Sequence, residues 1–213
     1  MPSLENSSYY WNRFWKNAIS RIWGGHTIEN LYRRLIYFSA FDRLLSSISL
    51  ADKDILELGS GTGNNSLYLT QQHHTQSVTL VDFSEQALAN VATTKWKCPV
   101  IKIQRDLLEF QPQKSYDFVH SAGLIEHFKG DLRLAIVRKH TEFACQGGLV
   151  MIWVPVHSPA FSLIGRFNRL LGIKEIPLTK RELKILCIQS GLDIIREDHS
   201  AFGALYGVLA RKV

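Results

Sequence analysis

The stretch Glu57-Leu58-Gly59-Ser60-Gly61-Thr62-Gly63 decides the fold of this 213-residue chain. Its first two residues end an expected short buried strand, 54–58, and it precedes a segment, 64–72, that can form a helix. Glycines in such a strand-to-helix turn allow a tight backbone and let a ligand approach it beside a helix N-terminus. The spacing is G-x-G-x-G rather than the G-x-G-x-x-G of dinucleotide binders, which argues against a nicotinamide oxidoreductase. The acidic Glu57, two positions before the first glycine, suits a ligand that carries an ammonium group.

Strand and helix patterns alternate outward from this turn. The expected strands are 54–58, 77–81, 100–104, 116–120, 149–154, 192–197 and 205–211, and the expected helices between them are 64–72, 85–93, 132–144 and 179–190. Such alternation predicts parallel βαβ units in a doubly wound, Rossmann-like α/β/α sandwich. Ligands of these sheets bind beyond the carboxyl ends of the strands.

Two further carboxylates follow expected strands. Asp82 ends the second strand, where it can accept both ribose hydroxyls of an adenosine, and Phe83 can pack on the adenine ring. Asp106 and Leu107 follow the third strand, where a carboxylate and a backbone amide can reach the adenine. An aspartate in either place can also simply cap a turn or helix. Three carboxylates at successive strand ends nevertheless favour an adenosine-containing ligand.

With these motifs, residues 50–213 resemble the class I S-adenosylmethionine-dependent methyltransferases. The resemblance implies a seven-stranded, mostly parallel sheet with an antiparallel last strand, 205–211. It implies that Asp82 holds the ribose and Asp106 the adenine of S-adenosylmethionine. The methionine part would be held by the turn residues Glu57, Gly59, Ser60, Gly61 and Gly63. Segment 117–125 matches the part that lines the methyl-transfer site, so Ser121 and Ala122 are also expected to contact the cofactor.

The same region narrows the chemistry. It lacks the Asn/Asp-Pro-Pro-Tyr/Phe of many DNA and protein amino-group methylases and the Pro-Cys of cytosine C5 methylases. Segment 124–128, Leu-Ile-Glu-His-Phe, instead resembles the "EH" segment of small-molecule methyltransferases. His127 is our candidate general base because an imidazole can take up a proton near neutral pH, although it could equally just fix the loop. Some relatives bind a divalent metal through E-x-x-E-H; here Gly123 replaces the first glutamate, so no metal is expected.

The acceptor is expected to meet segments outside the cofactor motifs. Residues 1–49 should form a helical extension and lid over the methyltransferase domain 50–213, with helical patterns at 9–23 and 28–47. Expected acceptor contacts are Tyr10, Trp11, Trp15 and His157. Segment 161–171 is apolar on one face and basic on another. It favours a lipophilic acceptor or peripheral contact with a membrane, unless its apolar face only packs on the core.

Composition leaves three functional classes to compare. The net charge is +6, residues 51–128 carry 9 acidic and 6 basic side chains, and residues 129–184 carry 4 and 10. A small-molecule methyltransferase is the expectation; the basic segments keep an RNA or protein methyltransferase as an alternative, for which nucleic-acid affinity would depend strongly on salt. A non-catalytic S-adenosylmethionine-binding protein is the third class. Three scattered cysteines and no signal-peptide pattern predict a cytoplasmic protein.

Overall fold

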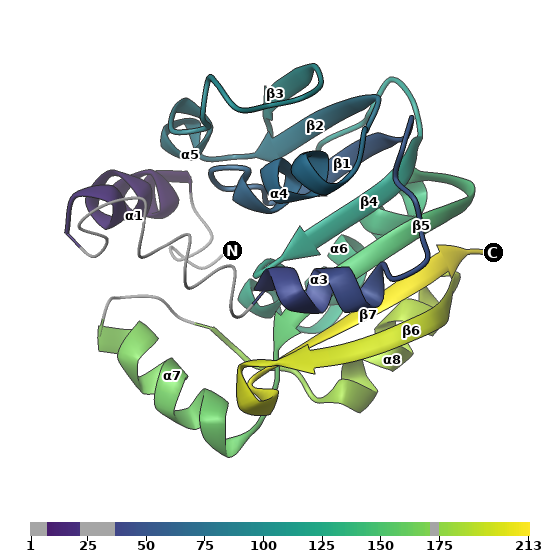
Figure 1. Cartoon of the computed structure of the whole chain (residues 1–213). Coiled ribbons are helices and arrows are strands. Elements are labelled where there is room, and N and C mark those ends of the chain that lie inside the picture. Colours follow the sequence, from purple (N-terminus) through teal and green to yellow (C-terminus); the bar gives the residue numbers. More distant parts are fainter. Residues whose placement is uncertain (1–7, 22–36, 171–174) are drawn as a thin grey trace.

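A seven-stranded sheet forms the centre of the molecule in the computed structural model, which describes residues 8–21, 37–170 and 175–213 (Figure 1). The strands are β1 (Asp54–Leu58), β2 (Ser77–Asp82), β3 (Val100–Gln104), β4 (Tyr116–Ala122), β5 (Ala144–Pro155), β6 (Leu192–Ser200) and β7 (Leu205–Lys212). Their order is β3-β2-β1-β4-β5-β7-β6. All neighbouring pairs are parallel except that β7 runs antiparallel to both β5 and β6. The Rossmann-like fold and the antiparallel last strand are therefore confirmed.

Helices cover both faces of the sheet. One face carries α3 (Ser39–Leu44), α4 (Asn64–Gln72) and α5 (Glu85–Ala89), which pack through side chains such as Phe41, Leu69 and Leu88. The other face carries α6 (Gly130–Phe143) and α8 (Lys180–Gln189), which pack through Ile136 and Leu183. Both cores consist of buried apolar side chains, the usual requirement for a mostly parallel sheet.

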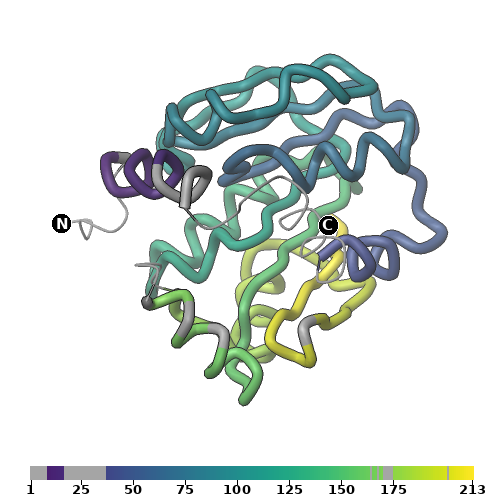
Figure 2. The backbone as a smooth tube through the Cα atoms, turned by 60° about the vertical axis from the view of Figure 1, so that its left-hand side comes forward, coloured from purple at the N-terminus to yellow at the C-terminus, as the bar shows by residue number. Residues whose placement is uncertain are grey.

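Two helices lie beyond the carboxyl ends of the parallel strands. These are α1 (Ser8–Arg21) and α7 (Pro159–Leu170), on the left of Figure 1, and the turned view of Figure 2 shows them on the same side of the sheet. Short 3-10 turns, η3 (Ile125–His127) and η4 (Ala201–Gly203), follow β4 and β6. Ligands bind at this edge in doubly wound sheets, and the strand order reverses here, where β1 lies between β2 and β4.

Most predicted elements are found, with shifted ends. The helix predicted over 179–190 is α8, and a capping box of Thr179 and Glu182 starts it. The helix predicted over 85–93 ends at Ala89, because the amides of Asn90 and Val91 form a turn to carbonyls three residues earlier. Strand β5 is longer than predicted, and the described part of the helical pattern over 28–47 ends at Leu44, with α3. The ends of the two N-terminal helical patterns within 22–36, and residue 171, lie outside the described residues.

One buried tryptophan fixes the packing of the central antiparallel pair. Trp153 on β5 is fully buried and meets the ring of Phe41 edge-on, with 5.9 Å between centroids. Its register partner on β7 is Gly207, where an added Cβ would lie 1.7 Å from the indole Cε3. The indole therefore occupies the space that any side chain at position 207 would need.

Candidate cofactor and acceptor site

The glycine turn adopts a backbone that only glycine takes up readily. Gly59, Gly61 and Gly63 all have positive φ, at 62°, 54° and 71°. A Cβ on Gly59 would lie 2.6 Å from Leu124 Cδ1, and one on Gly61 would lie 2.7 Å from Trp15 Cζ2. Between them, Ser60 is buried and its hydroxyl has no hydrogen-bond partner. The side chains of Leu124 and Trp15 thus cover the turn, and the buried hydroxyl of Ser60 within it has no hydrogen-bond partner in the chain.

The carboxylate of Glu57 joins β1 to the first turn of α4. Its Oε1 accepts from Asn65 Nδ2 at 3.1 Å, and its Oε2 accepts from Ser66 Oγ at 2.6 Å and from the Ser66 amide at 3.3 Å. Ser66 Oγ is in turn 2.9 Å from His120 Nε2 on β4. Sequence reasoning selected Glu57 but missed Ser66 and His120; a histidine directly after the apolar pair Phe118 and Val119 in β4 was the available signal. The contact of Glu57 with the cofactor stays a prediction.

Asp82 joins the end of β2 to the glycine turn. Its Oδ2 accepts from the Gly61 amide and its Oδ1 from the Ser84 amide, both at 2.8 Å. Burial raises the pKa of Asp82, while hydrogen bonds from the Ser84, Gly61 and Phe83 amides act in the opposite direction. The ring of Phe83 is half-buried. The structure therefore brings Asp82, Phe83 and the glycine turn together.

The residues predicted after β3 and β4 have different surroundings. Asp106 is exposed and accepts from the Leu108 amide at 2.9 Å, whereas the side chain of Leu107 is buried in the core.

Ser121 is buried and its hydroxyl lies 2.8 Å from His140 Nε2. Since His140 Nδ1 donates to the Ile136 carbonyl, Nε2 accepts from Ser121, and burial lowers the pKa of His140 to about 4. Any contact of Leu107 or Ser121 with the cofactor would thus be through the backbone, and Ala122 is half-buried at the end of β4.

Helix α1 spans the cofactor and acceptor parts of the site. The Trp15 ring lies against Gly61, and the Trp11 ring meets His127 edge-on with 4.9 Å between centroids. Asn12 Oδ1 accepts from Ser84 Oγ at 2.7 Å and from the Gln86 amide at 3.3 Å. Tyr10 packs edge-on against Trp11, at 5.4 Å. The structure therefore places Trp11 against His127 and Trp15 against the glycine turn, with Tyr10 packed on Trp11, and their contact with an acceptor stays a prediction. Sequence reasoning missed the hydrogen bonds of Asn12 to Ser84 and Gln86.

A buried carboxyl lies beside His127. Glu126 is fully buried, its Oε2 has no hydrogen-bond partner, and burial together with the nearby Glu175 raises its pKa to about 8. Glu175 accepts from Asn168 Nδ2 of α7 at 2.8 Å, and burial raises its pKa as well. The adjacent guanidinium of Arg133 donates to two backbone carbonyls and pairs with Glu182 at 2.5 Å. Sequence reasoning missed the pairing of Glu126 with Glu175, which are separated by 48 intervening residues.

Two other expectations concern the edge of the site. The His157 side chain is exposed and its backbone amide donates to the Leu178 carbonyl at 3.0 Å, so its contact with an acceptor stays a prediction. No three His, Cys, Asp or Glu side chains of the described ranges are grouped so that they could hold a metal ion. An open hollow of about 830 Å³ lies elsewhere, along β3 and the loop that follows it, and is lined by residues such as Ile101, Arg105 and Tyr116.

Known proteins share this architecture. Residues 55–148 match the sequence model of a family described as a methyltransferase domain. Magnesium protoporphyrin IX methyltransferase from Synechocystis PCC 6803, with bound S-adenosylhomocysteine, is 13% identical, has a TM-score of 0.70 and is matched over 100% of this chain and 97% of its own. The N-methyltransferase NodS from Bradyrhizobium japonicum WM9, also with S-adenosylhomocysteine, is 14% identical with a TM-score of 0.65, over 94% and 97% of the two chains.

A third structure, the complex of DhpI with S-adenosylhomocysteine, is 18% identical with a TM-score of 0.72, over 96% and 94% of the two chains. No curated protein matches the sequence. In the described ranges, no helix has the length and apolar character needed to cross a membrane. The family match covers residues 55–148, and the sheet topology is that of the Rossmann-like fold that these solved methyltransferases share.

Proposed function

We propose that this enzyme transfers the methyl group of S-adenosylmethionine to an oxygen or nitrogen atom of a small molecule. The observation that carries the proposal is the position of α1, whose Trp15 packs on the glycine turn while its Trp11 packs on His127. An acceptor between α1 and η3 would meet aromatic rings on one side and the imidazole on another. Aromatic rings beside an imidazole suit a partly apolar small molecule better than a nucleic-acid strand.

The residues at the carboxyl edge fit S-adenosylmethionine. The buried hydroxyl of Ser60, which has no hydrogen-bond partner, can hydrogen-bond to the methionine part, and the positive φ angles of Gly59 and Gly61 shape the turn beside it. Asp82 would hold the ribose, since an ionised carboxylate accepts more hydrogen bonds than the backbone amides supply. Phe83 and Asp106 would hold the adenine. When bound, the cofactor supplies an electrophilic methyl group on its sulfonium.

The chain itself would orient the acceptor, exclude water and move a proton. Holding the acceptor atom in line with the methyl group can contribute on the order of 7–11 kcal/mol to lowering the barrier. Closure of α1 over η3 would keep water from the charged sulfonium, which favours its displacement. His127 would take the proton that an acceptor hydroxyl loses, and the edge of Trp11 would hold its ring in place.

The test has a binding arm and a turnover arm. Calorimetry with S-adenosylhomocysteine should show association, and Asp82→Ala should weaken it. Release of S-adenosylhomocysteine should then be measured with a panel of phenols, hydroxy acids and amines, using His127→Gln as the base variant and His199→Gln as a control on β6. We expect turnover of at least one small acceptor and its selective loss in His127→Gln. Absence of association, with Asp82→Ala indistinguishable from the parent, would contradict the proposal.

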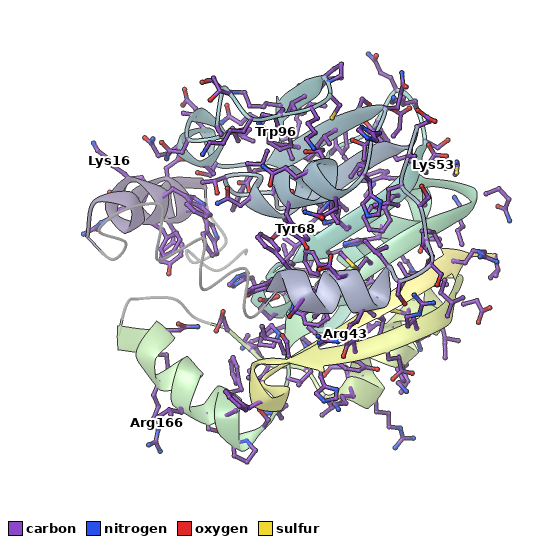
Figure 3. The ribbon with its side chains drawn as sticks, in the orientation of Figure 1. Lys16, Arg43, Lys53, Tyr68, Trp96 and Arg166 are labelled. Carbon is purple, nitrogen blue, oxygen red and sulfur yellow. The ribbon has the colours of Figure 1, made fainter. Side chains whose placement is uncertain are left out.

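A lipophilic acceptor drawn from a membrane surface is a second proposal, suggested by α7. Leu163 on this helix is 73% exposed, and Arg166 and Arg169 are also exposed; Figure 3 shows Arg166 pointing outward. Exposed leucine and arginine on one helix suit an anionic lipid surface. Co-sedimentation with vesicles containing phosphatidylglycerol should decrease in the double variant Leu163→Ser with Arg166→Glu. If the protein instead binds RNA in a salt-dependent way, and still does so when such vesicles are added as competitors, a macromolecular acceptor would be favoured.

A further inference from the structure

A buried polar chain of three residues connects the two ends of the glycine turn. Glu57 precedes the turn, Ser66 follows it on α4, and His120 lies next to Glu57 in the register of β1 and β4. We propose that His120 is a positioning residue of the cofactor site: through Ser66 it holds Glu57 and so fixes the turn that receives the methionine part. This inference rests on the proposed seat of S-adenosylmethionine.

The direction of each hydrogen bond follows from the number of protons. Ser66 has one hydroxyl proton, and Glu57 Oε2, at 2.6 Å, also accepts the Ser66 amide, so the hydroxyl donates to the carboxylate. His120 Nε2, at 2.9 Å from Ser66 Oγ, must then carry a proton and donate it to that oxygen. The chain thus runs from His120 through Ser66 to Glu57. Each bond polarises the next in a low-dielectric interior, so loss of the imidazole donor should weaken the bond from Ser66 to the carboxylate.

The surroundings keep His120 neutral in this role. It is fully buried, its ring stacks on Phe118 with 5.3 Å between centroids, and its Nδ1 has no hydrogen-bond partner. Burial, together with the nearby His140, lowers the pKa of His120 to about 3. A neutral imidazole with Nε2 protonated is therefore the form that donates to Ser66 across the pH range in which most enzymes work. An apolar side chain would fill the same space more simply, which points to the donor as the reason for a histidine here.

Different residues are assigned to the amino-acid part and to the nucleoside part of the cofactor. Glu57, Ser66 and His120 act at the ends of the glycine turn, whereas the nucleoside part is assigned to Asp82, Phe83 and Asp106. Loss of the His120 donor should therefore weaken ligands that contain the amino-acid part more than ligands that lack it. Methylthioadenosine has the same nucleoside as S-adenosylhomocysteine but no amino-acid group, so the pair isolates this effect.

The experiment compares His120→Gln, which keeps an amide N–H donor, with His120→Leu, which removes it, and adds Ser66→Ala. Dissociation constants for S-adenosylhomocysteine and methylthioadenosine are measured by calorimetry, and folding is checked by thermal unfolding. We expect His120→Leu and Ser66→Ala to lower the affinity for S-adenosylhomocysteine about tenfold and the affinity for methylthioadenosine less than twofold. His120→Gln should stay within about threefold of the parent for both ligands.

His140→Leu is the matched control, because it also removes a buried neutral histidine but one on the α6 face. It should lower the unfolding temperature without changing the ratio of the two affinities. Equal weakening of both ligands, or a glutamine variant that behaves like the leucine variant, would overturn the positioning role. If the parent protein binds neither ligand, the proposed cofactor site itself fails. If His120→Leu does not fold, the ligand affinities of Ser66→Ala and His120→Gln are compared instead, and they test the positioning role in the same way.

Discussion

Buried carboxyl groups behave differently in the two halves of the site. On the cofactor side, Glu57 and Asp82 each receive hydrogen bonds at both oxygens from the chain itself. On the acceptor side, Glu126 is equally buried but has an oxygen without a partner and a second carboxyl, Glu175, nearby. A buried polar group is costly unless it is hydrogen-bonded. The carboxylates of the proposed cofactor half are therefore hydrogen-bonded at both oxygens, whereas the proposed acceptor half holds a buried carboxyl that is not. With respect to their carboxyl groups, we call these the complete half and the incomplete half.

The largest effect is expected from changing a carboxylate of the complete half. Asp82→Asn would turn an amide NH₂ toward the Gly61 or Ser84 amide and remove charged hydrogen bonds to the ribose, each worth about 1.5–3 kcal/mol. Affinity for S-adenosylhomocysteine should fall 100-fold or more by calorimetry, while Asp193→Asn, an exposed change on β6, should leave it unchanged. A loss below tenfold would mean that Asp82 serves only to hold the turn.

Because of Glu126 in the incomplete half, the free energy of unfolding should depend on pH. The ordinary pKa of a glutamate is 4.5 and that of Glu126 in the folded chain is about 8, so between these values the folded state binds more protons and stability falls as pH rises. His120 and His140 act in the opposite sense, because their pKa values are lowered from 6.5 and the unfolded chain still loses part of its histidine protons above pH 6.5. From pH 6.5 to 8 the parent should therefore lose about 1 kcal/mol of unfolding free energy.

Glu126→Gln should flatten this pH dependence in denaturant titrations and make the protein more stable than the parent at pH 8. The exposed Glu109→Gln serves as the control and should keep the parental slope. A parent whose stability is constant over this range would show that Glu126 is ionised and balanced, and the contrast between the two halves would disappear.

A smaller effect is expected where α1 touches the complete half. Gly61→Ala places a side chain at φ +54°, which costs about 1–2 kcal/mol, and pushes its Cβ to 2.7 Å from Trp15. Cofactor affinity should fall about 10- to 30-fold in Gly61→Ala and about threefold less when Trp15→Ala is also present. The double-mutant cycle measures this coupling. Strictly additive effects would show that α1 does not rest on the turn when the cofactor is bound.

The smallest effect is expected from the link between the halves. Asn12→Ala removes the acceptor of the Ser84 hydroxyl and the Gln86 amide, which should loosen α1 without changing Asp82. The KM of an acceptor should rise about two- to fivefold, with cofactor affinity unchanged, and Arg13→Ala on the exposed side of α1 should have no effect. Weaker cofactor binding in Asn12→Ala would show that the Asn12 contact also supports the cofactor half.

The sequence predicted what depends on local pattern. Alternating apolar segments located the strands, and the glycine spacing located the turn that joins β1 to α4. The polar contacts that complete the site join distant segments: Asn12 meets Ser84, and Ser66 meets His120. No periodicity encodes such pairs, because each depends on how strands and helices are ordered in space. The same holds for Glu126, which looks like part of an exposed turn until Glu175 is brought beside it.

The tight fit of Trp153 over Gly207 has a spectroscopic consequence. This indole is fully buried far along the chain from the tryptophans of α1, which are only half-buried. It should contribute a blue-shifted emission that does not respond to ligands, so it serves as an internal reference. In a variant with Trp23→Phe and Trp96→Phe, movements of α1 would then be read from Trp11 and Trp15 in stopped-flow fluorescence, with no external dye attached to the protein.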